Sequence, residues 1–196
     1  MTPMSPESVS NPKLPKGQEA LLKAVIRVVA QKGLRGLTFR SLAAEANVSP
    51  ALAAHHFGTR EALIEEALKW STAQAVDSTH LQGFATSEDD YRDALTTSVV
   101  NDTDLHIFQF EMILEARRRP ELQPQIDDLY NTYLAAIKAD AQSLGLSNVS
   151  DATFRAVFAC IDGLIIQYLG GAITIQEFRE SALLMWDLVI AKESQA

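Results

Sequence analysis

Only one cysteine, Cys160, occurs in 196 residues, so no internal disulfide can form and no oxidising compartment is implied. Long apolar runs are also missing. The longest candidate, residues 156–169, is interrupted by Asp162 and Gln167 and is shorter than the roughly 18 residues of a membrane span. The first seventeen residues carry four prolines and no apolar segment, which is not typical of a secretion signal. We therefore expect a soluble, cytoplasmic protein without a membrane partner, with a disordered arm over residues 1–15.

Histidine is scarce, and no cysteine pair or glycine-rich phosphate loop is present. None of the four histidines has the spacing of a zinc-binding pair; they are His55, His56, His80 and His106. Glu111 and Glu115 lie one helical turn apart, but solvated helix faces and caps explain such carboxylate groupings without a metal. We expect no metal, no cofactor and no catalytic residue, and an enzyme is the least favoured class.

The formal net charge of −8 hides a segregation of charge along the chain. Residues 1–70 hold nine basic and six acidic side chains, whereas residues 71–196 hold eight basic and nineteen acidic ones. A basic N-terminal part on an acidic body is expected when one end of a molecule meets a polyanion. Because the imbalance is small, it supports nucleic-acid binding only together with other signals.

Helical periodicity and helix caps recur along the whole chain, and no segment alternates with period two over the length of a strand. The pattern predicts an all-α fold with an N-terminal domain over residues 16–76, a helical bundle over residues 77–196 and a polar linker over residues 82–88. The nine predicted helices span residues 16–32, 39–46, 50–56, 60–79, 88–100, 104–118, 120–143, 151–169 and 175–192.

The segment VSPALAAHHFGTREAL, residues 48–63, contains a helix that is too short to bury much. Ser49 can cap it, and Pro50 suits its first position, where the missing N–H has no consequence. Helices of seven or eight residues are unstable alone, so this helix and its predecessor depend on their neighbours. The short break between the two predicts a helix-turn-helix over residues 38–57, whose second helix can enter the major groove of DNA.

The segment TFRSLAAEANVSPALAAHHFGTREALIEEAL, residues 38–68, resembles the DNA-binding module of the TetR/AcrR regulators. The usual pattern of that family is T-x-x-x-I-A-x-x-A-G-V-S-x-x-x-L-Y-x-H-F-x-x-K-x-x-L. The residues in register here are Thr38, Leu42, Ala43, Ala46, Val48, Ser49, His56, Phe57, Arg60 and Leu63. Asn47 replaces the family's glycine, and a left-handed conformation is open to asparagine. Residues 53–54 are Ala-Ala instead of Leu-Tyr, so the phosphate contact of the tyrosine is missing and we expect a lower DNA affinity.

The resemblance and the chemistry of the side chains together assign the DNA contacts. Phosphate contacts, which fix the register on DNA, are expected from Thr38, Arg40, Ser49, Thr59 and Arg60. Contacts with base edges are expected from Pro50, Ala51, Ala54 and His55. We expect Leu52 and Phe57 to turn inward, and His56 to pack or to face a phosphate.

The acidic C-terminal part carries aromatic and methionine stripes, which are most often a helical core. The resemblance implies that some of them line a cavity for a small apolar or amphipathic effector. The candidate ligand-binding residues are Phe108, Gln109, Glu111, Met112, Tyr130, Tyr133, Phe158 and Asp162.

The last two predicted helices are apolar over more than one face, which indicates a homodimer formed by two helices of each chain. The candidate interface residues are Val157, Ile161, Leu164, Ile165, Tyr168, Phe178, Ala182, Met185, Trp186 and Val189. These expectations describe a ligand-responsive transcriptional repressor that binds a near-palindromic DNA operator as a dimer. The alternative is a related helical bundle that binds a small molecule or a protein partner with weak or lost DNA binding, and Ala54 favours it.

Overall fold

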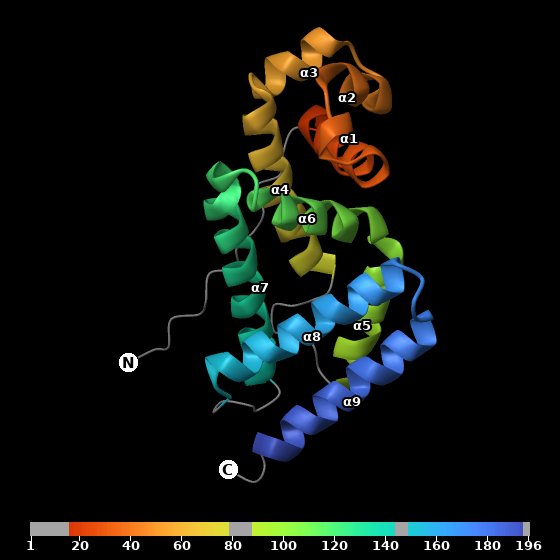
Figure 1. Cartoon of the computed structure of the whole chain (residues 1–196), viewed down its shortest axis with the longest axis vertical. Coiled ribbons are helices and arrows are strands. Elements are labelled where there is room, and N and C mark those ends of the chain that lie inside the picture. The colour runs from red at the N-terminus through yellow and green to blue at the C-terminus, as the bar shows by residue number, and fades with distance from the viewer. Residues whose placement is uncertain (1–15, 79–87, 144–148, 194–196) are drawn as a thin grey trace.

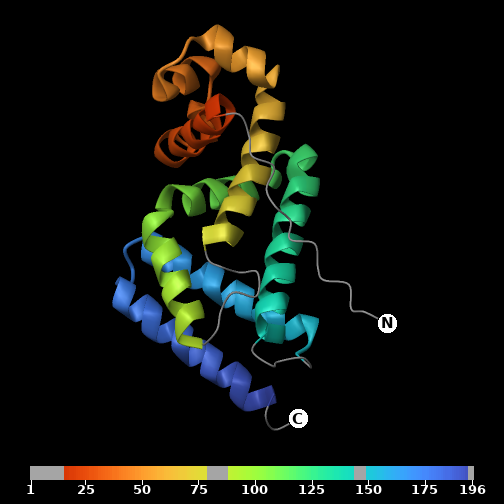
Figure 2. The same cartoon turned by 180° about the vertical axis from the view of Figure 1, so that it is seen from behind.

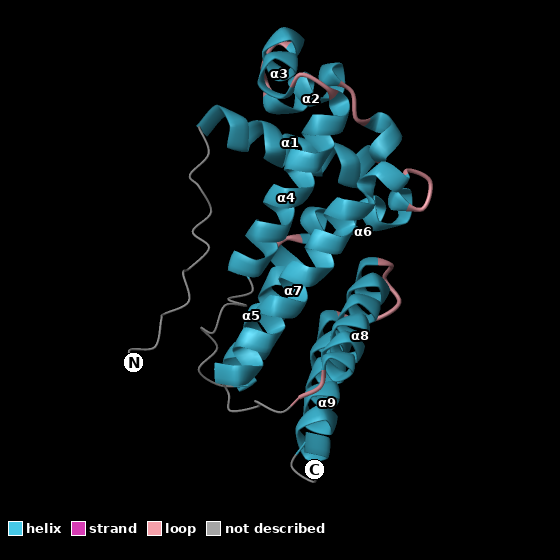
Figure 3. Cartoon of the chain, turned by 90° about the vertical axis from the view of Figure 1, so that its left-hand side faces the viewer, coloured by secondary structure: helices cyan, strands magenta, loops and turns pink. Residues whose placement is uncertain are grey.

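The computed structural model describes residues 16–78, 88–143 and 149–193, and within these ranges the chain is helical with no strand (Figure 3). The helices are α1 (Lys16–Lys32), α2 (Phe39–Ala46), α3 (Pro50–Phe57), α4 (Arg60–Ser78), α5 (Glu88–Asn101), α6 (Thr103–Ala116), α7 (Gln123–Ser143), α8 (Asp151–Leu169) and α9 (Ile175–Glu193). A 3₁₀ turn, η1 (Leu34–Gly36), lies between α1 and α2, and a second, η2 (Pro120–Leu122), lies between α6 and α7. The predicted all-α class is confirmed. The predicted arm over residues 1–15 and residues 82–87 of the predicted linker lie outside the described residues.

The helix boundaries follow from capping side chains. Ser150 accepts a hydrogen bond from the Thr153 N–H at 3.1 Å, which satisfies one of the N–H groups that the first turn of α8 leaves free. Thr174 and Glu177 form the predicted capping box of α9, with the Glu177 N–H donating to Thr174 Oγ1 at 3.2 Å and the Thr174 N–H donating to Glu177 Oε2 at 2.7 Å. The Thr174 N–H also lowers the pKa of the Glu177 carboxyl.

The prediction is off by a few residues between α6 and α7. Helix α6 ends at Ala116 rather than at residue 118, and the helix predicted from Pro120 is the turn η2 followed by α7. Proline restricts the residue before it to extended backbone, and Arg119 has φ −130° and ψ 82°. This break separates the two helices.

The molecule has two ends joined by α4. Helices α1, α2 and α3 lie together at one end, at the top in Figure 1, and α4 runs from this end down into the body (Figure 2). Helix α1 packs against α2, α4 and α6, and α4 also packs against α7. Helices α8 and α9 pair with each other on one side of the body (Figure 3). Because α4 contributes to both ends, it connects them mechanically.

Buried apolar side chains form one cluster that continues from the helix-turn-helix into the body. Helix α4 contributes to it along its whole length, from Leu63 and Ile64 near its start to Ala75 and Val76 near its end. The largest fully buried side chains are Phe108, Phe178, Leu21, Leu22, Leu37, Leu42, Leu63, Ile64, Leu68, Met112 and Ile137. A displacement of one end of α4 therefore has to be accommodated at the other end, since protein interiors are close-packed.

By length and composition alone, α8 is the one helix among the described residues that could cross a membrane. Its side chains Phe154, Val157 and Ile161 are buried in the body, and Asp162 interrupts its apolar sequence. One face of α8 therefore packs into the bundle.

Candidate DNA-binding site and effector cavity

Helix α3 lies at the far end of the molecule from α8 and α9 (Figure 1). Ser49 caps it by accepting a hydrogen bond from the Leu52 N–H at 3.2 Å, and Pro50 occupies its first turn. Asn47, at φ 54° and ψ 47°, makes the left-handed turn between α2 and α3 that glycine makes more often. The local sequence thus produces the predicted helix-turn-helix with its second helix at an extremity.

Most of the predicted DNA-contacting residues lie on the surface of this end. The exposed ones are Thr38, Arg40, Ser49, Pro50, Ala51, His55, His56 and Thr59. Ala54 and Arg60 are half-buried. The exposed residues at this end include two basic groups, Arg35 of η1 and Arg40 of α2, and small side chains along α3.

The prediction that Leu52 turns inward is wrong, because its side chain is 42% exposed. The inward residues of α3 are Ala53 and Phe57, which lie one helical turn apart and are buried. Counting back four residues from Phe57 would have identified Ala53 as the inward position. Leu52 therefore joins the exposed surface of α3.

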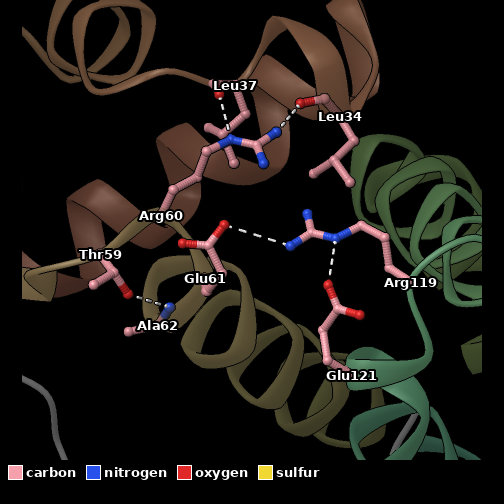
Figure 4. A network of polar contacts seen from close by, with 8 residues as sticks. All are labelled: Leu34, Leu37, Thr59, Arg60, Glu61, Ala62, Arg119 and Glu121. Atoms are coloured by element: carbon pink, nitrogen blue, oxygen red, sulfur yellow. Dashed lines mark hydrogen bonds and ion pairs between the residues drawn. The ribbon is translucent and has the colours of Figure 1, made fainter.

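Arg60 holds the helix-turn-helix together from the inside, which corrects its predicted role as a surface phosphate contact. Its Nε donates to the Leu37 carbonyl at 2.8 Å and one Nη donates to the Leu34 carbonyl at 2.6 Å (Figure 4). Both carbonyls belong to the connection between α1 and α2. The guanidinium thus ties the start of α4 to that connection, and its hydrogen bonds to the backbone are charge-assisted.

A second set of polar contacts joins the helix-turn-helix to the body. Arg119, before η2, contacts Glu61 of α4 at 3.4 Å and Glu121 at 3.0 Å (Figure 4). Glu111, a predicted ligand-binding residue, accepts a hydrogen bond from the Leu34 N–H at 3.1 Å. Glu111 therefore lies at the junction between α6 and η1 and not among the residues that line the cavity.

A cavity of about 40 Å³ lies inside the body between α4, α5, α6, α7 and α8. Four of the predicted ligand-binding residues line it: Gln109, Tyr133, Phe158 and Asp162. Phe108 and Met112 are fully buried core residues outside its lining, and Tyr130 packs edge-on against Phe158 at 5.6 Å between ring centroids. The remaining lining residues are Ala75, Leu95, His106, Phe110, Ile113, Leu129, Ile137, Ile161 and Ile165.

A chain of hydrogen bonds leads from this cavity to α4. The Tyr133 hydroxyl donates to Gln109 Oε1 at 2.8 Å, and Gln109 Nε2 donates to Ser71 Oγ at 3.4 Å. Ser71 in turn donates to the Leu68 carbonyl at 2.8 Å, inside α4. Burial raises the pKa of Tyr133, so the phenol remains protonated and keeps its role as a donor.

The sequence prediction did not include His106, which is a polar residue of the cavity lining. Its side chain is only 6% exposed, and its Nε2 has no hydrogen-bond partner. Burial lowers the pKa of His106 to about 4, and burial raises the pKa of Asp162, across the cavity lining, to about 6. His106 lies three residues before Gln109 and seven before Ile113, so the helical stripe through Gln109 would have identified it.

The structure corrects the predicted dimer interface. Most of the predicted residues are buried inside the protomer: Val157, Ile161, Leu164, Ile165, Phe178 and Ala182. Tyr168 and Met185 are half-buried, and the side chains of Trp186 and Val189 lie outside the described part of the structure. Among the described side chains of α8 and α9, the large apolar ones that are exposed are instead Ile166, Leu184 and Leu188. Sequence periodicity alone did not separate the face of each helix that packs inward from the face that remains open.

An exposed helix-turn-helix on a helical body with an internal cavity is the architecture of a one-component transcriptional regulator. The family description "Bacterial regulatory proteins, tetR family" matches residues 21–67, and "Tetracyclin repressor-like, C-terminal domain" matches residues 86–188. The chain therefore belongs to the TetR family of transcriptional regulators.

Individual relatives agree with this assignment. The chain is 27% identical over 168 residues to the HTH-type nicotine-responsive transcriptional repressor HdnoR of Paenarthrobacter nicotinovorans. This match covers 77% of this chain and 82% of HdnoR. It is 42% identical over 50 residues to the HTH-type transcriptional regulator BetI of Rhizobium meliloti, a match that spans 26% of this chain and 25% of BetI. A TetR-family regulator from Rhodococcus sp. has the same fold, with a TM-score of 0.74, 24% identity and coverage of 89% of this chain and 99% of that one.

Proposed function

We propose that this protein is a ligand-responsive repressor that binds a near-palindromic operator as a homodimer in the cytoplasm, without catalytic activity. One observation carries the proposal: helix α3 is exposed at one end of the molecule, while α4 runs from it to a cavity in the body. Residues 16–76 serve as the DNA-binding domain and residues 77–196 as the domain for effector and dimer contacts. Two separate sites connected by shared elements are what an allosteric regulator requires.

The DNA contacts divide into two groups. Arg40, Thr38, Thr59 and the start of α3 at Ser49 position the module on phosphates, since helix N-termini and basic side chains attract them. Along α3, the small side chains of Pro50 and Ala51, with Leu52, allow close approach and apolar contacts with thymine methyl groups. His55 donates or accepts a hydrogen bond at a base edge, and His56 lies beside it. Arg60 stabilises the module through its hydrogen bonds to the Leu34 and Leu37 carbonyls. Ala54 is half-buried and, as an alanine, makes no phosphate contact.

We place the dimer interface on the outer faces of α8 and α9. A stripe of small residues with Ile166 runs along α8 to its C-cap at spacings of four and three: Ala152, Ala156, Ala159, Gly163, Ile166 and Gly170. Gly163 is half-buried and the others are exposed. Such spacing puts side chains on one helix face, and small side chains let a second helix approach closely. Leu184 and Leu188 of α9 are 61% and 63% exposed, so they add apolar area that a partner helix would cover.

The effector site is the cavity in the body. HdnoR, to which most of this chain is similar, is a nicotine-responsive repressor, which supports a small-molecule effector for this chain. At about 40 Å³ the cavity holds little more than water, so an effector has to push the surrounding helices apart. Helix α6 carries cavity residues on one face and Glu111 on another, and α4 carries Ser71, so both transmit the displacement to the DNA-binding end.

Fluorescence anisotropy with labelled DNA from immediately upstream of the gene, compared with scrambled DNA, tests this function. We expect tight binding to the upstream DNA that weakens steeply with salt, since phosphate contacts release counterions. The variants Arg40→Ala and His55→Ala should both lower affinity, and only His55→Ala should reduce the preference for the upstream sequence. Equal and weak binding to both DNAs would reject the proposal.

The second candidate function is a bundle that binds a small molecule or a protein partner after losing its operator. It is favoured by Ala54, which stands where relatives of the family carry a tyrosine and which is half-buried here. Retained ligand binding without any sequence preference on DNA would support it. Restoring the aromatic residue with Ala54→Tyr would then be expected to increase DNA affinity.

A further inference from the structure

Three polar side chains reach the cavity from three different helices: His106 from α6, Tyr133 from α7 and Asp162 from α8. A fourth, Gln109, is occupied, because its amide oxygen accepts from Tyr133 and its amide nitrogen donates to Ser71. The hydrogen-bonding capacity left for a ligand therefore depends on the other three.

His106 offers a lone pair to the cavity. The ring also forms a hydrogen bond with the Ser98 backbone, which on its own raises the pKa of His106. A raised pKa means that the ring donates its N–H to a carbonyl oxygen. Because Nε2 has no partner, the nitrogen that donates to Ser98 is Nδ1. Burial has the larger effect and lowers the pKa of His106 to about 4. The ring is therefore neutral near pH 7, and its Nε2 is a hydrogen-bond acceptor.

Tyr133 and Asp162 are acceptors as well. The Tyr133 hydrogen is already donated to Gln109, so only the oxygen lone pairs remain. Asp162 ionises above about pH 6, and the groups whose pKa it influences are the Tyr130 and Tyr133 phenols. Asp102 adds a further negative charge that acts on His106 and Tyr133. Within the described part of the chain, no lysine or arginine lines the cavity.

The rest of the wall is apolar and partly aromatic, with Phe110 and Phe158 facing the cavity beside Ile113, Ile161 and Ile165. A negatively charged site with aromatic walls attracts cations, and an apolar wall favours a flat hydrocarbon body. An anion or a ligand that carries only acceptors would leave the buried Nε2 unpaired, and an unpaired buried polar group destabilises the complex.

We propose that the effector is an organic cation with N–H donors, a protonated amine or amidine on a flat apolar body, whose N–H groups pair with Asp162 and with Nε2 of His106. This inference rests on the proposed function, because it takes the cavity as the effector site. It narrows the apolar or amphipathic effectors expected from the sequence to those that carry positive charge.

The ionisation of Asp162 gives the proposal a pH dependence. A cation pairs with the carboxylate form, and burial holds the pKa of Asp162 at about 6. Affinity for the cation should therefore increase as the pH rises through about 6 and decrease below it. His106 does not contribute in this range, because it protonates only near pH 4.

Isothermal titration with benzamidine, benzamide and benzoate tests the inference, since these probes share one ring and one shape and differ in charge. Benzyltrimethylammonium, a cation without N–H donors, separates charge from hydrogen bonding. We expect benzamidine to bind at least tenfold more tightly than the other three, at pH values above about 6.

Asp162→Asn, which removes the charge and keeps the volume, should abolish the preference for benzamidine. His106→Phe should weaken benzamidine more than benzyltrimethylammonium, and the matched change Asp128→Asn, at an exposed position of α7, should have no effect.

Benzamide or benzoate binding as tightly as benzamidine would overturn the inference, and so would an unchanged benzamidine affinity in Asp162→Asn. Absence of saturable benzamidine binding up to its solubility limit would overturn it too. Operator binding, measured separately without any probe, tells these failures apart from a failure of the proposed function. Sequence-specific DNA binding without a cation preference would leave the regulator in place and reject only the effector class.

Discussion

At the scale of single residues, two arginines of the same module have different tasks. Arg40 is exposed on α2, whereas Arg60 is half-buried and bound to the Leu34 and Leu37 carbonyls. Both carry the same charge, and the resemblance to the family suggests phosphate contacts for both. Only the structure distinguishes a side chain that is free to reach DNA from one that stabilises the fold.

This difference predicts opposite results for the two alanine variants. Arg60→Ala should lower the free energy of unfolding by roughly 2–3 kcal/mol, since it removes two charge-assisted hydrogen bonds. The Leu37 carbonyl loses its bond to Arg60, whereas the Leu34 carbonyl keeps the Leu37 N–H as a donor. Arg40→Ala should leave stability within about 0.5 kcal/mol and reduce the slope of log affinity against log salt by about one. Urea unfolding and salt-dependent anisotropy measure the two quantities. Equal stability of both variants would contradict the role given to Arg60.

His106 predicts a pH dependence of stability. Its pKa is about 4 in the folded protein and about 6.5 in the unfolded chain, so between these values the unfolded chain binds more protons. Stability should therefore decrease as the pH falls from about 6.5 to 4, by roughly 3 kcal/mol from this residue. The variant His106→Phe should lack this contribution, which urea unfolding across the pH range would reveal as a difference from the wild type. Parallel curves for both proteins would count against a buried neutral histidine.

The residues of the helix-turn-helix could be predicted well from the sequence, because caps, turns and a dense motif fix their positions locally. The cavity residues could be predicted only in part. Gln109 and Tyr133 lie on the expected stripes, but His106 looks like a core histidine until its unpaired Nε2 is seen. Glu111 shares a helix with the cavity residues but points toward Leu34, and only the packing of α6 on α1 reveals this.

At the scale of secondary structure elements, α1, α2 and α8 begin and end where the sequence predicts. Capping side chains fix the starts of α2 and α8. The assignment of helix faces was less successful. Helices α8 and α9 are apolar around much of their circumference, and hydrophobicity alone does not tell which side meets the body. As a result, the residues predicted for the dimer interface, such as Ile161 and Phe178, are core residues.

The small-residue stripe of α8 gives a prediction at this scale. A Cβ added at Gly163 meets nothing within 4 Å in the protomer, so a longer side chain there fits the isolated chain. Gly163→Arg should keep the helical content and the thermal transition of the protomer but prevent close approach of a second α8, which dissociates the dimer. Light scattering after size-exclusion chromatography reports the mass, and Ala135→Arg, exposed on α7, is the control. A Gly163→Arg protein that stays dimeric would place the interface elsewhere.

At the scale of the whole molecule, signal transfer depends on the elements shared by the two ends. Helix α6 faces the cavity with Gln109 and Ile113 and reaches the turn η1 through Glu111. Helix α4 joins the same ends through the core. An effector that separates α6 from α7 and α8 therefore also shifts the support of the helix-turn-helix.

Glu111→Ala should uncouple the two sites without damaging either. Operator affinity and benzamidine affinity should each remain within about threefold of the wild type, whereas the loss of operator affinity caused by benzamidine should shrink by about 1 kcal/mol. Anisotropy with and without benzamidine measures this difference. Glu115→Ala on the same helix removes the ion pair with Arg118 and serves as the control. Full coupling in Glu111→Ala would show that the signal travels through α4 or the packed core alone.

The most direct test of a dimeric, sequence-specific regulator is a DNase footprint of the purified protein on the DNA upstream of its gene. We predict two protected half-sites related by a near-palindrome, with centres about 34 Å apart, one turn of DNA, because two copies of α3 enter successive major grooves. Protection should disappear in His55→Ala at concentrations that saturate the wild type. Uniform protection along the fragment, or a single half-site without symmetry, would contradict the account.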